Sequence, residues 1–327
     1  MNKQPKSDRG LRRLAALLAL AAAPLAALAW TDKPVRLLVP APPGGTIDVV
    51  ARILAEQLTA DIGQPVVVDN KPGAGGAIAV QAMTSAPADG QTIMVTASNV
   101  LVEIPHVMKT AFDPLKDVKP VAAVARSGLV LIVAPNAPAT DLKSLIAYVK
   151  SQPGKLSFAS YSAGTASQYA GMMLNQKAGL DLQHVPFAGS PPALQQVMAG
   201  QIPVMFDGIV TSLPQIRAGK VKPIAMATKT RSAHLPDLPT MAELGYPEFD
   251  FGSWLGVIVA SGMPQATAAK ISAAVLKAAG APKVRERLAA AGFELEPQDA
   301  EQLERAIKAD YERNAGIVKA YNIKLNQ

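Results

Sequence analysis

Short runs of β-branched residues alternate with longer amphipathic stretches along most of this chain, and this alternation limits the folds that it can form. The runs have the length and composition of strands, and the stretches between them are long enough for helices. We predict strands at residues 35–39, 66–68, 92–96, 121–125, 129–134, 156–160, 202–206, 224–227 and 255–259. Strands that alternate with helices predict an α/β fold, in which helices cover a largely parallel sheet.

The first helix is the clearest of the predicted helices. Its apolar residues recur at the spacing of one buried helix face, as Ile47, Val50, Ala51, Leu54 and Leu58. Glycine often ends a helix because it adopts the left-handed conformation at little cost. We therefore predict that this helix ends near Gly63.

Two interruptions of the alternation predict that the chain passes between two lobes. The predicted strands at residues 121–125 and 129–134 are separated only by Arg-Ser-Gly, which is too short for a crossover helix. The Pro- and Gly-rich segment at residues 235–252 interrupts the alternation again and is the candidate return crossing.

The two crossings and the N-terminal segment described below predict three parts of the chain. Residues 1–29 form a signal peptide, residues 30–127 plus 252–327 form lobe 1, and residues 128–251 form lobe 2. The helical tail at residues 265–321 is then expected to pack back on lobe 1.

The first 29 residues have the three parts of a secretory signal. Basic residues precede an apolar run at residues 14–29, and the small residues Ala27 and Ala29 stand at the positions that a signal peptidase reads. The run contains Pro24 and is too short to cross roughly 30 Å of hydrocarbon comfortably. We predict general secretion to the periplasm with cleavage after Ala29; an uncleaved anchor helix and a twin-arginine signal are the alternatives.

The charge of the chain is concentrated in this segment. The whole sequence has 32 basic and 25 acidic residues, and removal of the predicted signal leaves 27 basic and 24 acidic residues. The remaining excess is too small and scattered to indicate a nucleic-acid partner. The sequence contains no cysteine, which excludes disulfides, thiolate metal sites, a thiol nucleophile and a lipid-modified N-terminal cysteine.

Four glycine-rich segments each follow a predicted strand and precede a predicted helix, at residues 40–50, 71–80, 160–168 and 186–194. Glycine lets a ligand approach backbone N–H groups that have no intrahelical partner, and the helix dipole favours an anion there. Each segment alone could be an ordinary turn, but two fall in each predicted lobe and can meet at a cleft. None matches a nucleotide motif, and their low positive charge favours a small carboxylate held by neutral donors.

The sequence offers little support for catalysis. The histidines His106, His184 and His234 stand in unrelated contexts, and no Gly-x-Ser-x-Gly elbow is present. Asp48 lies in the first turn of a predicted helix and is predicted to be structural. Asp207 follows a predicted strand and either contacts a hydroxyl, an ammonium group or a water, or caps the next helix. We predict no metal and no cofactor.

Several ordered segments resemble those of one protein family. They are KPVRLLVPAPPGGTIDVVARILAEQL, GQPVVVDNKPGAGGAIA, LPTMAELGYPEFDFGSWLGVIVASGMP and RERLAAAGFE. They resemble the extracytoplasmic binding proteins of tripartite tricarboxylate transporters, also called Bug receptors, over nearly all of the chain after the predicted signal. The resemblance implies a two-lobed, type II-like periplasmic binding protein fold. Each lobe would be a central β-sheet flanked by helices, with the ligand cleft between the lobes.

The resemblance also implies which residues bind the ligand. Residues of lobe 1 would hold one carboxylate through backbone donors and ordered water: Pro42, Pro43, Gly44, Gly45, Thr46, Gly76, Ala77, Ser98 and Asn99. Residues of lobe 2 would contact the distal part of the ligand: Ser160, Gly164, Thr165, Ala188, Gly189 and Asp207.

Four positions depart from the residue that is common in the family. Ala41 replaces an aromatic residue, Gln168 a histidine, Ala188 a lysine and Ser162 a glycine. The loss of a ring and a cation implies a roomier and less cationic pocket.

We therefore expect a monomeric, non-catalytic receptor that closes on a small organic carboxylate. The family implies that it delivers this ligand to the large and small membrane subunits of a tripartite transporter. One alternative is a periplasmic enzyme acting on a small anionic substrate, for which Asp207 is the candidate group. Another is a ligand sensor for a membrane kinase. The sequence does not identify the carboxylate.

Overall fold

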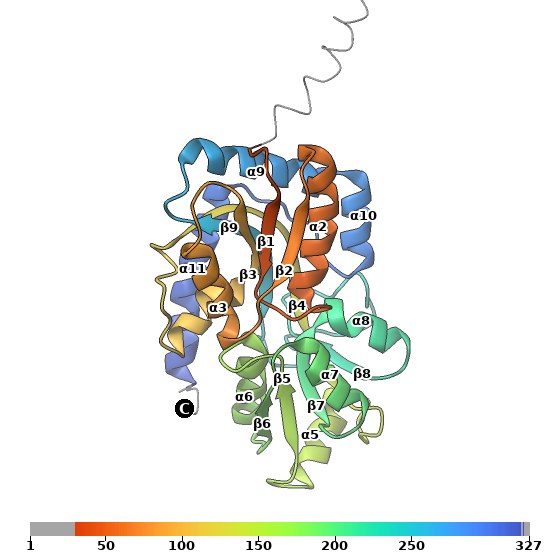
Figure 1. Cartoon of the computed structure of the whole chain (residues 1–327). Helices are drawn as coiled ribbons and strands as arrows, with labels where there is room; N and C mark the ends of the chain where they lie inside the picture. Colours follow the sequence, from red (N-terminus) through yellow and green to blue (C-terminus); the bar gives the residue numbers. More distant parts are fainter. Residues whose placement is uncertain (1–29, 322, 324–327) are drawn as a thin grey trace, which may run out of the picture.

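The computed structural model describes residues 30–321 and 323 (Figure 1). The predicted signal peptide lies outside the described residues. In this described part of the chain, nine strands form two sheets that share one long strand, with helices on the faces of both. The α/β class expected from the sequence is confirmed.

The first sheet has the strand order β2 (Val66–Asn70), β1 (Val35–Val39), β3 (Thr92–Ala97), β9 (Gly252–Ala260) and β4 (Val118–Val133). Successive residues of β1 point to opposite faces, as strand geometry requires: Leu37 belongs to one buried cluster and Leu38 to a second. The helices on the first face are α2 (Thr46–Ile62), α9 (Gln265–Gly280) and α10 (Pro282–Ala290), and those on the other are α3 (Ala77–Thr84), α4 (Ser98–Val102) and α11 (Ala300–Ala320).

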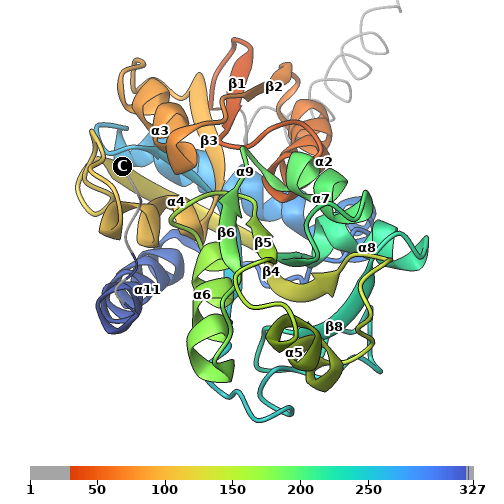
Figure 2. The ribbon, with the colours of Figure 1, turned by 90° about the horizontal axis from the view of Figure 1, so that it is seen from below.

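The second sheet uses the second half of β4. Its other strands are β7 (Val204–Gly208), β5 (Ser157–Ser160), β6 (Gln183–Pro186) and β8 (Lys222–Met226). The helices around this sheet are α5 (Leu142–Lys150), α6 (Ala166–Ala178), α7 (Ser190–Met198) and α8 (Ile209–Arg217) (Figure 2). Short 3₁₀ helices at Ala74–Gly76 (η1) and Ile104–His106 (η2) complete the described elements.

Strand β4 joins the two sheets without a break. The sequence predicted two strands separated by Arg-Ser-Gly, but these three residues stay extended because they pair with residues 252–254 of β9. The predicted lobe boundaries at 127/128 and 251/252 fall at this pairing, with Gly128 opposite Gly252. The division of the chain at these residues stays a prediction.

The prediction of a largely parallel sheet was wrong. Among the described residues, β1 pairs in parallel with β2 and β3, and β5 pairs in parallel with β6 and β7. The pairs β3–β9, β9–β4, β4–β7 and β4–β8 are antiparallel. The crossing strands β4 and β9 run in opposite directions because one leaves the first sheet and the other returns to it.

The remaining predictions for the elements agree closely with the structure. Helix α2 ends at Ile62, and Gly63 caps it in the left-handed conformation with φ 68°. Helices α9 and α10 pack on α2, and α11 packs on α4 and β4, so the helical tail covers the first sheet as predicted. Strand β6 was not predicted, because its sequence, Gln-His-Val-Pro, is too short and polar to stand out.

Candidate ligand-binding cleft

A cavity of about 440 Å³ lies between the two sheets. Its volume is in the range of small-ligand sites. Its lining residues come from both sheets and from the strands that join them: Pro40, Ala41, Pro42, Gly45, Thr46, Ile47, Pro72, Gly73, Ala74, Gly75, Gly76, Ala97, Asn99, Met108, Ser127, Gly128, Leu129, Tyr161, Ser162, Ala163, Pro186, Phe187, Ala188, Gly189, Ser190, Gly208, Ser253 and Leu255.

The loop before α2 forms one part of the cavity wall, and Asp48 fixes its shape from behind. The carboxylate of Asp48 accepts hydrogen bonds from the N–H of Gly44 (2.9 Å), from Arg52 Nε (2.8 Å) and from Asn70 Nδ2 (2.9 Å). Burial would raise the pKa of Asp48, but these hydrogen bonds outweigh it and lower the pKa below its ordinary value. The structural role predicted for Asp48 agrees with these contacts, which place the first turn of α2 at the cavity.

The loop before α3 forms a second part of the wall and has an unusual backbone. Gly73, Ala74, Gly75 and Gly76 all have positive φ, and Ala74 (φ 46°) has the only positive φ of a non-glycine residue in the described chain. A Cβ at Gly75 would lie 2.2 Å from Cδ1 of Ile104, so this loop must pass close to η2. Left-handed alanine is strained, and such strain is common at functional sites.

Hydroxyl groups collect where β4 and β9 cross between the sheets. Ser127 of β4 is paired with Ser253 of β9, and Ser253 Oγ lies 2.8 Å from Ser98 Oγ. Ser127 Oγ is buried and has no hydrogen-bond partner in the described structure. Asn99 lines the cavity beside this group. The cleft floor therefore carries polar atoms that are not all used by the protein.

The wall from the second sheet approaches the first loop closely. A Cβ at Gly189 would lie 2.3 Å from Cγ of Pro42, and a Cβ at Gly208 would lie 2.9 Å from Oγ1 of Thr46. Because larger residues would not fit at either position, these glycines allow the two sides of the cleft to touch.

The N-terminus of α6, in contrast, is already occupied by protein groups. Gly164 N–H donates to Gln168 Oε1 (2.7 Å), and Ala166 N–H donates to Glu103 Oε2 (2.6 Å). Thr165 Oγ1 donates to the carbonyl of Ser162 (2.8 Å). Glu103 comes from the segment between α4 and η2, so this contact connects the two sheets. Burial raises the pKa of Glu103 to about 7.

Ser160 is also used within the protein. Its Oγ lies 3.0 Å from the carbonyl of Ser162 and 2.7 Å from Nε2 of His184. Burial lowers the pKa of His184 to about 4, so this imidazole is neutral at neutral pH and shapes the turn.

Asp207 connects the starts of α7 and α8 instead of facing the cavity. Its carboxylate is fully buried and accepts hydrogen bonds from Ser190 Oγ (2.6 Å), Thr211 Oγ1 (2.7 Å) and Ser212 Oγ (2.7 Å). Burial raises the pKa of Asp207, and the three hydroxyl groups limit the rise. Asp207 thus supports the wall through Ser190, which does line the cavity.

The structure brings together only some of the residues predicted as ligand contacts. Those that line the cavity are Pro42, Gly45, Thr46, Gly76, Asn99, Ala188 and Gly189. Those that lie behind or beside it are Pro43, Gly44, Ala77, Ser98, Ser160, Gly164, Thr165 and Asp207. Sequence reasoning missed Ser127, Ser253, Leu129 and Leu255; their only signal was their position at the two predicted crossings.

The described part of the chain contains no group of acidic residues and histidines that could hold a metal ion. No helix among the described residues is both apolar and long enough to cross a bilayer.

Comparison with known proteins identifies the family. Residues 50–323 match the tripartite tricarboxylate transporter family receptor, TctC. BugT of Bordetella pertussis is 33% identical over 306 residues, which are 93% of this chain and 94% of BugT. The chain belongs to this receptor family.

Solved structures confirm the fold of the receptor. The periplasmic binding protein BugD superposes with a TM-score of 0.85 at 32% identity, covering 90% of this chain and 100% of BugD. MatC from Rhodopseudomonas palustris, solved with bound malate, has a TM-score of 0.82 at 32% identity and covers 88% and 99% of the two chains. An R. palustris protein solved with adipate has a TM-score of 0.85 at 28% identity, covering 90% and 100%.

Membership settles the class of function. The receptor is a periplasmic solute-binding protein of a transport system and not an enzyme. The periplasmic binding protein fold and the receptor function expected from the sequence are confirmed.

Proposed function

We propose that this receptor binds a small organic carboxylate in the cleft between its two sheets and delivers it to the membrane subunits of a tripartite transporter. Among the described residues, none that line the cavity is charged. The first turn of α2, whose N–H groups have no intrahelical partner, lies at the cavity. Such helix starts favour anions, so neutral donors can hold a carboxylate here.

Ser127 is the observation that carries this proposal. A buried hydroxyl without a partner destabilises a folded protein, and a ligand that completes its hydrogen bonding removes this cost. Ser127 lines the cavity together with Thr46 and Asn99. We assign the carboxylate contact to these three side chains and to the α2 start at Gly45. Relatives solved with malate and adipate support an acidic ligand.

Isothermal titration calorimetry against organic acids and their neutral amides tests the proposal. We expect an acid to bind with a dissociation constant near a micromolar, which corresponds to about 8 kcal/mol, and its amide to bind much more weakly. Nuclear magnetic resonance of the mixture should show the acid unchanged. Equal affinity for the amide, or conversion of the acid, would contradict the proposal.

Delivery in the periplasm requires export, and we propose that the signal peptide is removed after Ala29. Trp30, the first described residue, is buried and donates from Nε1 to the carbonyl of Gly90 (2.8 Å), so the folded domain extends to this residue. The intact mass of the protein from a periplasmic extract should correspond to a chain beginning at Trp30. A mass that retains the first 29 residues would contradict this cleavage. We also propose that the receptor is a monomer.

A further inference from the structure

The polar and apolar groups of the cavity are not spread evenly over its walls. Among the described residues, the side chains of Thr46, Asn99 and Ser127 line the cavity without a hydrogen-bond partner in the protein, and they lie on α2, α4 and β4. Thr46 lies in the first turn of α2, where backbone donors have no intrahelical partner, and Asn99 and Ser127 line the same cavity. This side of the cavity can satisfy the oxygens of one carboxylate.

On the opposite wall, from the second sheet, several polar groups are already used by the protein. Ser162 Oγ donates to the carbonyl of Ala163 (3.2 Å), and Ser190 Oγ donates to Asp207 (2.6 Å). The backbone N–H groups of Phe187 and Gly189 donate to the carbonyls of residues 160 and 161 (2.9 and 2.8 Å).

Helix α7 adds few donors to this wall. It begins at the cavity with Ser190, and the next two residues are Pro191 and Pro192, which carry no N–H. Two of the free donors that a helix start usually offers to an anion are therefore absent.

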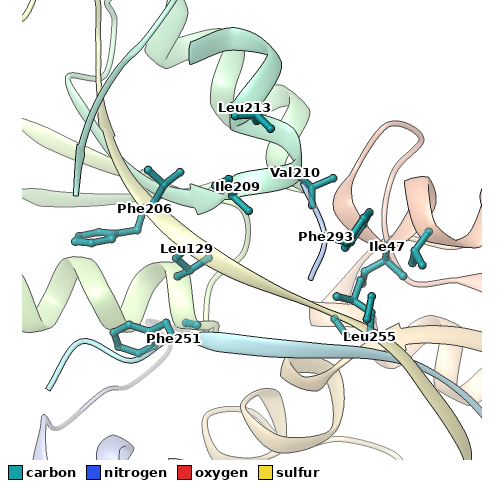
Figure 3. Close-up of a cluster of buried hydrophobic side chains, with 14 of the residues drawn as sticks. Ile47, Leu129, Phe206, Ile209, Val210, Leu213, Phe251, Leu255 and Phe293 are labelled. Atoms are coloured by element: carbon teal, nitrogen blue, oxygen red, sulfur yellow. The ribbon is translucent and has the colours of Figure 1, made fainter. Parts of the chain in front are cut away.

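Apolar side chains make up much of the remaining cavity surface, which also includes Tyr161, Ser253 and the loop before α3. Ile47, Leu129 and Leu255 line it, and Figure 3 shows the same three side chains as part of a continuous buried hydrophobic cluster. Phe187 and Met108 also line this surface. No lysine, arginine or histidine in the described chain lines the cavity, so a second carboxylate would lose its hydration without gaining a cation.

We propose that the natural ligand is an organic monocarboxylate with an apolar body, and that the cleft selects against a dicarboxylate of the same length. This proposal rests on the proposed function of the cleft. The single carboxylate lies at the start of α2 beside Ser127, and the apolar body occupies the space among Leu129, Leu255 and Phe187.

Matched acids that differ in one group test the selection. Calorimetry with hexanoate and adipate compares one and two carboxylates on the same chain, and benzoate and terephthalate do so on a ring. We expect at least one monocarboxylate to bind ten-fold or more tightly than its dicarboxylate partner. Adipate or terephthalate binding as tightly as its partner, or tighter, overturns the monocarboxylate proposal and leaves the proposed function standing. If none of the four acids binds, or if hexanamide binds as tightly as hexanoate, the result counts against the monocarboxylate proposal and against the proposed function.

A variant with a new cation supplies a second, independent readout. Ala188 lines the cavity and is exposed, so Ala188→Lys should fold and place an ammonium group on the second wall. We expect this variant to narrow or reverse the preference for hexanoate over adipate by about ten-fold. Ala188→Met, of similar length without the charge, should keep the preference. An unchanged ratio in Ala188→Lys would overturn the assignment of the distal end of the ligand to this wall.

Discussion

Ser127 differs from several other hydroxyl groups at or near the cleft. Ser160, Ser190 and Ser212 each have a protein partner within hydrogen-bond distance, whereas Ser127 Oγ is buried and has none in the described structure. Its side chain therefore contributes nothing to the folded protein through hydrogen bonding. The proposed role of Ser127 in binding rests on this unpaired hydroxyl.

Ser127→Ala should weaken ligand binding without harming the fold. A hydrogen bond to a charged group is worth about 1.5–3 kcal/mol, so we expect calorimetry to show affinity reduced at least ten-fold. The thermal midpoint of the free protein should stay equal or rise, because a buried unpaired hydroxyl is removed.

Ser212→Ala is the control for Ser127→Ala. It removes a hydrogen bond to the buried Asp207 carboxylate and should destabilise the free protein by about 1–3 kcal/mol. Unchanged ligand affinity in Ser127→Ala would contradict the assignment of Ser127.

At the scale of elements, the position of each helix start decides whether it can bind an anion. The start of α2 lies at the cavity. The start of α6 is instead occupied by Glu103, which lies between α4 and η2 beside the first sheet. The start of α7 has two prolines. Similar glycine-rich turns in the sequence therefore have different roles in the structure.

The contact between Glu103 and α6 predicts a dependence of stability on pH. Burial raises the pKa of Glu103 from 4.5 to about 7, and Asp310 adds to the rise while Arg313 and the Ala166 N–H oppose it. The folded state therefore binds more protons than the unfolded state between these values. The stability that this group contributes is fully present below pH 4.5 and is lost as the pH rises through about 7.

Glu103→Gln should remove this dependence, because the amide stays neutral and can still accept from Ala166. Denaturant unfolding should show the variant close to the wild type at pH 5 and more stable at pH 8, by up to about 3 kcal/mol. Burial also raises the pKa of Asp207 and Asp310, so the stability of both proteins depends on pH for this reason too. The difference in unfolding free energy between the variant and the wild type at each pH removes this shared dependence. A difference that does not change with pH would refute the role of Glu103.

The loop at Gly189 predicts a separate effect on closure. Gly189 has φ 120°, and a Cβ there would lie 2.3 Å from Pro42. Gly189→Ala should therefore separate the two walls and reduce ligand affinity at least ten-fold in calorimetry.

Gly179→Ala is the matched control for Gly189→Ala. Gly179 also has a positive φ (62°), but a Cβ there meets no atom within 4 Å. This substitution should lower stability by about 1–2 kcal/mol and leave affinity unchanged. Equal affinities of Gly189→Ala and the wild type would show that the close approach is not needed for binding.

At the scale of the whole molecule, one buried hydrophobic cluster includes side chains from both sheets and their helices. Figure 3 shows Phe293, which follows α10, near Val210 and Leu213 of α8. A Cβ at the neighbouring Gly292 would lie 3.4 Å from Leu213 Cδ2, so these segments are in contact. The cluster connects the helical tail to the second sheet.

Phe293→Ala should destabilise the protein strongly. Phe293 is 2% exposed, and removal of a buried phenyl ring costs about 3–5 kcal/mol. Denaturant unfolding should show this loss, whereas Leu244→Ala, at a position 38% exposed, should change stability by less than about 0.5 kcal/mol. A loss for Phe293→Ala as small as that for Leu244→Ala would contradict the role of this cluster.

The sequence predicted the elements with strong local patterns. Helix α2 and strand β1 agree with their predicted ranges because the apolar spacing and the Gly63 stop are local signals. The continuity of β4 was not predictable, because Arg126–Gly128 looks like a turn until its pairing with β9 is known. The short polar strand β6 is likewise held by its neighbour β5 and not by its own residues.

The candidate site could be predicted in part for the same reason. Gly45, Thr46 and Gly189 were found because glycine-rich turns are visible in the sequence, and they line the cavity. Asp207 was considered as a ligand contact, but its carboxylate is surrounded by hydroxyl groups from two helices that are distant in the sequence.

The sequence by itself determined the α/β class, the receptor family and the absence of thiol chemistry, because periodicity, motifs and composition are properties of the chain alone. The tertiary structure decided which turns face the cavity, which donors remain free and where the sheets cross. These depend on contacts between segments far apart in the chain, such as Glu103 with Ala166 and Ser127 with Ser253. The proposed chemistry of the ligand rests on those contacts, because they determine which polar groups are left to bind it.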